Sequence, residues 1–131
     1  MLLKEEVEKM QRKINVISIC HLNEDLTAIS YKTIIDDIKE FYKIIQCNCI
    51  DIIVRYIDGI PYNIICDDEG WFKQNPIITL TSEDKTEAIV GNIIIAPINY
   101  IESEELGSFV NEHQAKMLMK RLLINHTFSY E

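Results

Sequence analysis

The sequence predicts an α+β fold in which helices cover a mostly antiparallel, curved sheet. Isoleucine-rich stretches with the alternation of strands recur along the chain, and two other stretches have helical periodicity. The dipeptide Asp58-Gly59 separates two of the strand-like stretches, as a tight hairpin turn does. We therefore expect a central β-hairpin over about residues 50–66, with one helix before it and another at the C-terminal end.

Composition indicates a single globular domain over residues 1–131. Of the 131 residues, 47% are hydrophobic and 26% are charged, which is the balance of a chain that buries a core. No apolar run is long enough to span a membrane, and the first residues are too acidic for a signal peptide. We therefore expect a cytoplasmic protein with no membrane contact.

The charge balance restricts the possible partners. With 13 basic and 21 acidic residues the formal net charge is −8, so a broad nucleic-acid backbone would be repelled. Two kinds of partner remain open. A local basic pocket could hold one small anion, or the acidic surface could bind a protein, including a DNA-binding protein for which it acts as a DNA mimic.

The first half of the chain predicts an arm, a strand and a helix. Residues 1–12 have a short helical pattern and form either a helix or an arm onto a partner subunit. Residues 13–22 alternate, with apolar side chains on both faces, which predicts a strand covered on both sides. A helix is then expected after a cap at Ser30, ending at Cys47-Asn48. Its apolar stripe comprises Ile34, Ile35, Ile38, Phe41, Tyr42 and Ile45.

The second half predicts the hairpin, further strands and a helix. Asp58-Gly59 suits a type I′ turn, in which both central residues have positive φ. Residues 89–96 are almost wholly apolar and predict one interior strand, in which Gly91 marks either a bulge or a place where another group approaches the backbone closely. A capping box of Asn111 and Gln114 predicts the last helix, and residues 125–131 are expected to be a loose tail. The apolar stripe of that helix comprises Ala115, Leu118, Met119 and Leu122.

Three short motifs, at residues 64–70, 75–76 and 90–94, resemble a family of small uncharacterised (domain-of-unknown-function) proteins. They read IICDDEG, NP and VGNII in this chain. The family occurs in phages, prophages and mobile elements of Gram-positive bacteria, and the resemblance spans roughly residues 13–122. It implies no catalytic residue. It implies instead a phage gene expressed in the cytoplasm of a bacterial host, where many small proteins counter host defences.

Five residues are the candidate ligand-binding residues: Arg55, Trp71, Asn92, Asp67 and Glu69. Arg55 lies among apolar neighbours, either as a rim residue or as an anchor for a phosphate or carboxylate. Trp71 packs in the core or, if exposed, offers a stacking surface. Asn92 either holds a bulge or reads the polar edge of a ligand. Residues 67–70 form either a solvated turn, with Gly70 at positive φ, or an acid/base or metal site.

No motif in the chain predicts catalysis, a metal or a cofactor. The spacing of the cysteines lacks a C-x-x-C pair, and no glycine-rich phosphate loop is present. The leading hypothesis is a non-enzymatic binding protein that sequesters a small nucleotide signal of host immunity through Arg55, Trp71 and Asn92. The alternative is an acidic inhibitor of a host protein, and a hydrolase using Asp67 and Glu69 ranks third. We also expect a homodimer or larger oligomer, because two helices leave part of an isoleucine-rich sheet uncovered.

Overall fold

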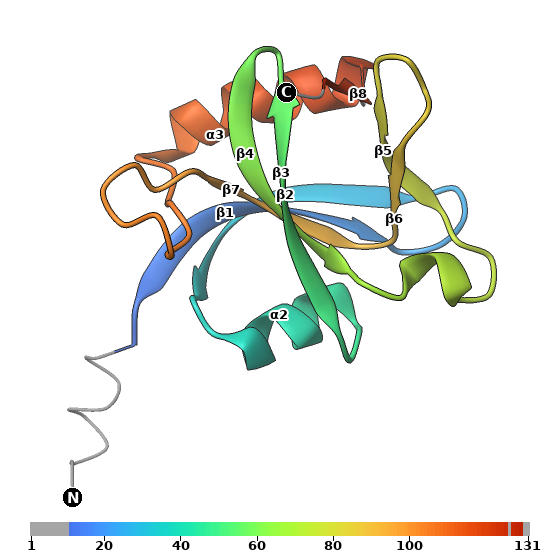
Figure 1. Ribbon diagram of the computed structural model, residues 1–131, viewed down its shortest axis with the longest axis horizontal. Helices are drawn as coiled ribbons and strands as arrows, with labels where there is room; N and C mark the ends of the chain where they lie inside the picture. Colours follow the sequence, from blue (N-terminus) through green and yellow to red (C-terminus); the bar gives the residue numbers. More distant parts are fainter. Residues whose placement is uncertain (1–10, 126, 130–131) are drawn as a thin grey trace, which may run out of the picture.

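The computed structural model describes residues 11–125 and 127–129 and contains two sheets and two α-helices (Figure 1). The larger sheet has the strand order β2-β1-β7-β4-β3, and every neighbouring pair in it is antiparallel. Its strands are β1 (Lys13–His21), β2 (Thr27–Ile35), β3 (Ile50–Ile57), β4 (Ile60–Asp67) and β7 (Ile93–Pro97). The predicted α+β class, with a mostly antiparallel sheet, is confirmed. The expected helix or arm over residues 1–12 falls largely outside the described residues.

The smaller sheet has the order β6-β5-β8, in which β5 pairs antiparallel with β6 and parallel with β8. Its strands are β5 (Ile78–Ser82), β6 (Ala88–Val90) and β8 (Thr127–Phe128), and a short 3₁₀ helix, η1 (Gly70–Phe72), precedes β5. The α-helices are α2 (Ile38–Ile45) and α3 (Glu112–Asn125). No helix in the described part of the chain is long and apolar enough to cross a membrane.

The β3–β4 hairpin lies at an edge of the larger sheet, and β7 is the middle strand. Residues Ile57 and Ile60 pair across the turn, and both turn residues have positive φ, 53° for Asp58 and 79° for Gly59. These values are those of a type I′ turn. The turn chemistry is therefore a local property of Asp58-Gly59, whereas the central position of β7 comes from contacts with strands far away in the sequence.

Two apolar clusters cover the two faces of the larger sheet. Strand β1 contributes to both, because successive side chains point to opposite faces. Ile14 and Val16 pack in the cluster beside α2, and Ile17 and Ile19 pack in the cluster beside α3. All four are buried. The prediction that this strand is covered on both sides is confirmed.

The predicted helix after Ser30 is wrong over its first half. Residues Thr27–Ile35 form strand β2, which pairs antiparallel with β1 along its whole length, and α2 begins only at Ile38 after Asp37. The isoleucines at 34, 35 and 38 fit a helical stripe. Thr27–Ile35 is also rich in β-branched residues, however, and pairing with β1 satisfies its backbone groups.

The predicted single strand over residues 89–96 is also wrong. Gly91, with φ 80°, and Asn92 separate β6 from β7, and these two strands belong to different sheets. An apolar run shows that a segment is buried, but it does not show where the chain changes sheet. The positive φ at Gly91 is the local cause of the break, because a residue with a side chain rarely adopts it.

The C-terminal region confirms the helix and corrects the tail. The Gln114 N–H donates to Asn111 Oδ1 (3.0 Å), and Gln114 Oε1 accepts from the Val110 N–H (2.7 Å), one residue before the expected partner. Ala115, Leu118 and Leu122 are buried as expected. Residues 127–129 are not a loose tail, because β8 pairs with β5 and Phe128 is buried in the core beside α3.

His21 links the two sheets and predicts a pH-dependent stability. Its Nδ1 lies 3.0 Å from Thr27 Oγ1 and its Nε2 lies 2.7 Å from Thr79 Oγ1. The Thr79 hydroxyl donates to the Gly91 carbonyl (2.5 Å), so Nε2 must donate to Thr79. Burial lowers the pKa of His21 from its usual 6.5. The neutral ring therefore contributes stability that is complete above about pH 6.5 and is lost as the pH falls through the folded-state pKa.

Urea unfolding at pH 7.5 and pH 5.0 tests this expectation. The parent should lose more stability over that interval than His21→Gln, which has no titrating ring but keeps a side-chain N–H. The carboxylates contribute equally to both proteins, so the difference isolates His21. Equal losses in the two proteins would show that His21 has the same pKa in the folded and unfolded states.

Candidate functional site

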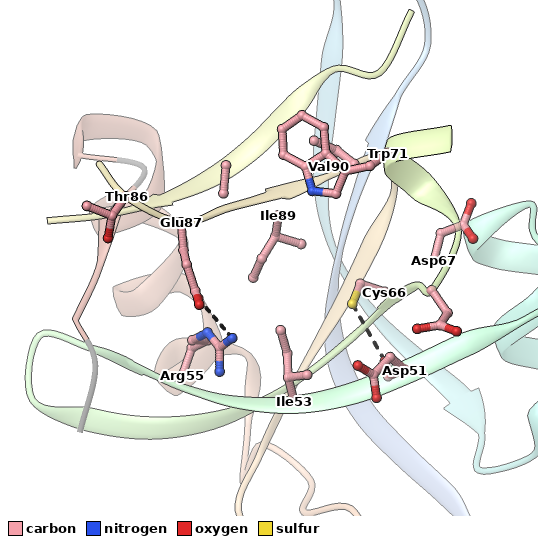
Figure 2. Close-up of a pocket in the computed structure, with 12 residues that line it drawn as sticks. Asp51, Ile53, Arg55, Cys66, Asp67, Trp71, Thr86, Glu87, Ile89 and Val90 are labelled. Carbon is pink, nitrogen blue, oxygen red and sulfur yellow. Dashed lines mark hydrogen bonds and ion pairs between the residues drawn. The ribbon is translucent and has the colours of Figure 1, made fainter. Parts of the chain in front are cut away.

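A pocket of about 400 Å³ opens between the β3–β4 hairpin and strand β6. Figure 2 shows side chains from the hairpin on one side of it and from the β5–β6 region on the other. Its lining comprises Asp51, Ile53, Arg55, Cys66, Asp67, Asp68, Trp71, Thr86, Glu87, Ala88, Ile89 and Val90. Three of the five predicted site residues, Arg55, Trp71 and Asp67, therefore lie around one cavity.

Local structure explains how the two sides of the pocket come together. Asp51, Ile53 and Arg55 are alternate residues of β3, so their side chains share one face of the strand. On the other side, a Cβ at Gly70 would lie 2.9 Å from Val90 Cγ2. Only glycine allows η1 to approach β6 so closely. The expectation that Gly70 needs positive φ is wrong, because the positive-φ glycines are Gly59 and Gly91.

The guanidinium of Arg55 already contacts other groups of the protein. Its NH2 group lies 3.1 Å from Glu87 Oε2, and its NH1 group donates to the Val54 carbonyl (2.8 Å). The guanidinium also lies over the Phe128 ring, 5.5 Å from the ring centroid. These contacts occupy the two nitrogens that a bidentate anion contact uses. Arg55 therefore links β3 to β8 and to the segment just before β6, and these contacts leave it poorly placed to anchor a phosphate.

The carboxylates of the pocket are only partly neutralised. Asp67, with a side chain only 6% exposed, pairs with Lys73 Nζ at 2.5 Å, and Glu87 pairs with Arg55. Asp51 and Asp68 form no ion pair with any residue in the described ranges 11–125 and 127–129. The pocket therefore carries an excess of negative charge, and this charge is concentrated at the β3–β4 side.

Trp71 lines the pocket and is 56% exposed. Of the two roles considered for it, packing in the core is therefore wrong, and an accessible ring is what the structure shows. In Figure 2 the indole of Trp71 and the side chain of Asp51 lie at opposite sides of the pocket. Ile53, Ile89 and Val90 provide the apolar part of the lining. The cavity therefore combines an aromatic ring, an apolar surface and unpaired carboxylates.

Asn92 and Glu69, the other two predicted site residues, lie outside this pocket. Asn92 Oδ1 accepts the His21 backbone N–H (2.8 Å), and its Nδ2 donates to the Ile45 carbonyl (3.3 Å). It therefore connects β1 to the end of α2, a structural role. Glu69 is exposed, and its N–H donates to Asp67 Oδ1 (2.9 Å) in the turn before η1. That turn places Asp67 and Asp68 at the pocket, whereas Glu69 points elsewhere.

The thiol in the pocket is poorly suited to nucleophilic chemistry. Burial, with a further contribution from the Asp51 carboxylate, raises the pKa of Cys66 to about 11. At neutral pH almost all of it is the unreactive thiol. Within the described residues, no group of three or more His, Cys, Asp and Glu side chains could hold a metal ion.

The sequence interpretation missed two acidic residues of the pocket, Asp51 and Glu87. Asp51 and Arg55 are both odd-numbered residues of β3, so strand alternation places them on the same face. The sequence therefore contained the signal that Asp51 lies beside Arg55. Glu87 lies just before β6 and Val90 lies in β6, and no local pattern connects them to the hairpin. Comparison with known proteins adds nothing to this picture, because no protein family, curated protein or solved structure matches the chain. The resemblance to the phage proteins therefore stays a prediction.

Proposed function

We propose that this chain is a non-enzymatic binding protein whose acidic pocket receives a lysine or arginine side chain of a partner protein. One observation carries the proposal: the exposed ring of Trp71 lines the same cavity as Asp51 and Asp68, two carboxylates without an ion pair in the described part of the chain. In the host cytoplasm that the phage resemblance implies, such a protein acts by occupying the basic surface of a host protein.

The physical basis is the affinity of a cation for both kinds of group. A guanidinium or ammonium over an aromatic face gains about 0.5–2 kcal/mol, depending on how far it is desolvated. The nearby carboxylates provide charge-assisted hydrogen bonds, and arginine can bond one of them through two nitrogens. The net charge of −8 adds long-range attraction for a basic partner and accelerates its association.

A nucleotide ligand is the second candidate, since Arg55 and Trp71 do line one pocket. Two observations count against it. Glu87 already pairs with Arg55, and the lining carries four carboxylates, from Asp51, Asp67, Asp68 and Glu87, against that single cation. A phosphate entering the pocket would meet this excess negative charge. An acidic surface that imitates DNA is compatible with the lysine or arginine pocket, because both attract basic proteins.

Calorimetry with short peptides tests the proposal. An arginine-rich peptide and a lysine-rich peptide should bind, and a panel of cyclic nucleotides and cyclic ADP-ribose isomers should give no heat. Trp71→Ala should weaken peptide binding about tenfold, the loss of roughly 1.4 kcal/mol of cation–π interaction. Asp51→Asn should weaken it further, and binding of the parent should decline as salt is added.

Two matched variants separate the pocket from general surface charge. Phe72→Ala removes an aromatic ring that is 89% exposed but does not line the pocket, so it should leave peptide binding unchanged. Glu69→Gln removes a carboxylate from the same turn as Asp68 and should have only a small effect. Equal losses for Asp51→Asn and Glu69→Gln would show that the peptides bind the acidic surface without using the pocket. Heat from a nucleotide and none from the peptides would favour the second candidate.

A further inference from the structure

Strand β2 forms one edge of the larger sheet, and the hydrogen bonds at its two ends show which residues face outward. The Leu22 N–H donates to the Leu26 carbonyl (2.8 Å), and the Asp36 N–H donates to the Arg12 carbonyl (2.8 Å). Along an antiparallel pair, residues alternate between bonding toward the partner and bonding away from it. Even-numbered residues of β2 therefore bond to β1. The outward N–H and C=O groups belong to Thr27, Ile29, Tyr31, Thr33 and Ile35.

Strand β3, at the opposite edge, is protected at its end near the turn. The Asp68 N–H donates to the Cys49 carbonyl, so by the same alternation the even-numbered residues of β3 face outward: Ile50, Ile52, Val54 and Tyr56. Tyr56 exchanges two hydrogen bonds with Ser129, and the Val54 carbonyl accepts from Arg55. On β2 only the Ile35 carbonyl is used in this way, by the Asp37 N–H (2.9 Å). The backbone groups of Thr27, Ile29, Tyr31 and Thr33 have no such partner among the described residues.

The sequence of β2 has few of the features that prevent edge pairing. Proteins protect exposed edges with proline, bulges or charged residues. Strand β2 contains no proline, pairs with β1 without a bulge, and carries one charged residue, Lys32. Every residue that bonds outward is β-branched or aromatic, the types that favour strand pairing. Ile29 and Tyr31 are only partly buried, against the cluster beside α3, so a further strand would cover them.

We propose that β2 pairs antiparallel with β2 of a second copy of this chain, with Tyr31 on the two-fold axis. This arrangement places Ile29 opposite Thr33 of the other copy. The outward N–H and C=O groups of one β2 then lie opposite those of the other and can bond to them. The charge of β2 itself does not oppose a second copy at this place. The chain carries −8 overall, but β2 has no carboxylate, and Lys32 faces Ser30 of the other copy. Two acidic chains can thus meet along β2 without opposing carboxylates within the paired strands.

The dimer is expected to be reversible and to strengthen with salt. One strand edge is a small interface, at the low end of those that form stable complexes. Salt screens the repulsion between the two acidic chains, so added salt favours the dimer. Peptide binding at the pocket should have the opposite salt dependence. The pocket lies at the β3–β4 side of the sheet, so a dimer through β2 leaves the pocket open. The dimer therefore does not depend on the function proposed for the pocket.

Sedimentation equilibrium between about 1 and 100 μM tests the proposal with one pair of variants at Thr33. Thr33→Pro removes an outward N–H, which β1 does not use, and should give a monomer at every concentration. Thr33→Val is the control. Both substitutions remove the hydroxyl that donates to Asn15 Oδ1 (2.7 Å), but valine keeps the N–H and should dimerise like the parent. A parent that is monomeric at 100 μM, or a Thr33→Pro variant that dimerises like Thr33→Val, would overturn the proposal.

Amide hydrogen exchange on the parent protein gives a second test that requires no variant. The amides of Ile29, Tyr31 and Thr33 should become protected as the protein concentration rises through the dimerisation range. The Val54 amide, which faces outward on β3, should exchange at the same rate throughout. If the chain dimerises while the three β2 amides remain unprotected, the interface lies elsewhere and the proposal is wrong.

Discussion

Gly107→Ala is expected to lower the free energy of unfolding by about 3 kcal/mol, because the added methyl group would overlap the backbone. Gly107 is buried, and its N–H donates to the Pro97 carbonyl (2.8 Å). A Cβ at this position would press on the Pro97 carbonyl oxygen and would lie 2.8 Å from the Pro97 carbonyl carbon and 2.9 Å from that of Ile98. Backbone atoms cannot rotate away, so the segment after β7 must shift. Urea unfolding of parent and variant measures the effect.

Gly59→Ala is the matched control for that prediction. Gly59 has φ 79°, but no atom lies within 4 Å of the position that its Cβ would occupy. The substitution should therefore cost only about 1–2 kcal/mol, from the left-handed conformation itself. Gly59→Val, with a β-branched side chain, should cost about 1–3 kcal/mol. If Gly107→Ala is no more destabilising than Gly59→Ala, then Gly107 does not approach the backbone of Pro97 as closely as described.

Phe128→Ala is expected to lower the free energy of unfolding by about 3–5 kcal/mol, the range for a buried aromatic residue. Phe128 is only 1% exposed and packs in the cluster beside α3. The ring also lies beneath Arg55, which pairs with Glu87 across the pocket. Chemical denaturation followed by circular dichroism gives the value. Phe72→Ala, at a ring that is 89% exposed, should change stability by less than about 0.5 kcal/mol. Similar values for the two variants would contradict the place of Phe128 in the core.

The parts of the fold that the sequence predicted correctly depend on local chemistry. Asp58-Gly59 has the positive φ values of its turn, and Asn111 and Gln114 cap α3. The errors occur where distant contacts decide the structure. Thr27–Ile35 became a strand because β1 lies beside it, and residues 127–129 are ordered because β5 and Tyr56 pair with them. A short C-terminal segment has too few residues for its periodicity to indicate a strand.

The candidate site was predictable to a similar extent. Alternation along β3 placed Arg55 correctly on one face, and residues 67–70 do form a turn at the end of β4. The anchor role considered for Arg55 stays a prediction. Its partner Glu87 lies 32 residues further along the chain, just before β6, so no local pattern could show the ion pair. Asn92 follows Gly91, a glycine within an otherwise apolar stretch, and that position indicated that Asn92 either holds a bulge or contacts a ligand. Its bonds to His21 and Ile45 give it a structural role, which contacts far away in the sequence create.

The most direct test of the pocket uses the fluorescence of Trp71, which is the only tryptophan in the chain. A cation that settles over the indole changes its environment, so titration with N-acetyl-arginine amide should shift or quench the emission in a saturable way. The same titration of Asp51→Asn should need a several-fold higher concentration, and cyclic nucleotides should leave the emission of the parent unchanged. Emission of the parent that does not respond to the arginine compound, or that responds to nucleotides alone, would contradict the proposal of a pocket for basic side chains.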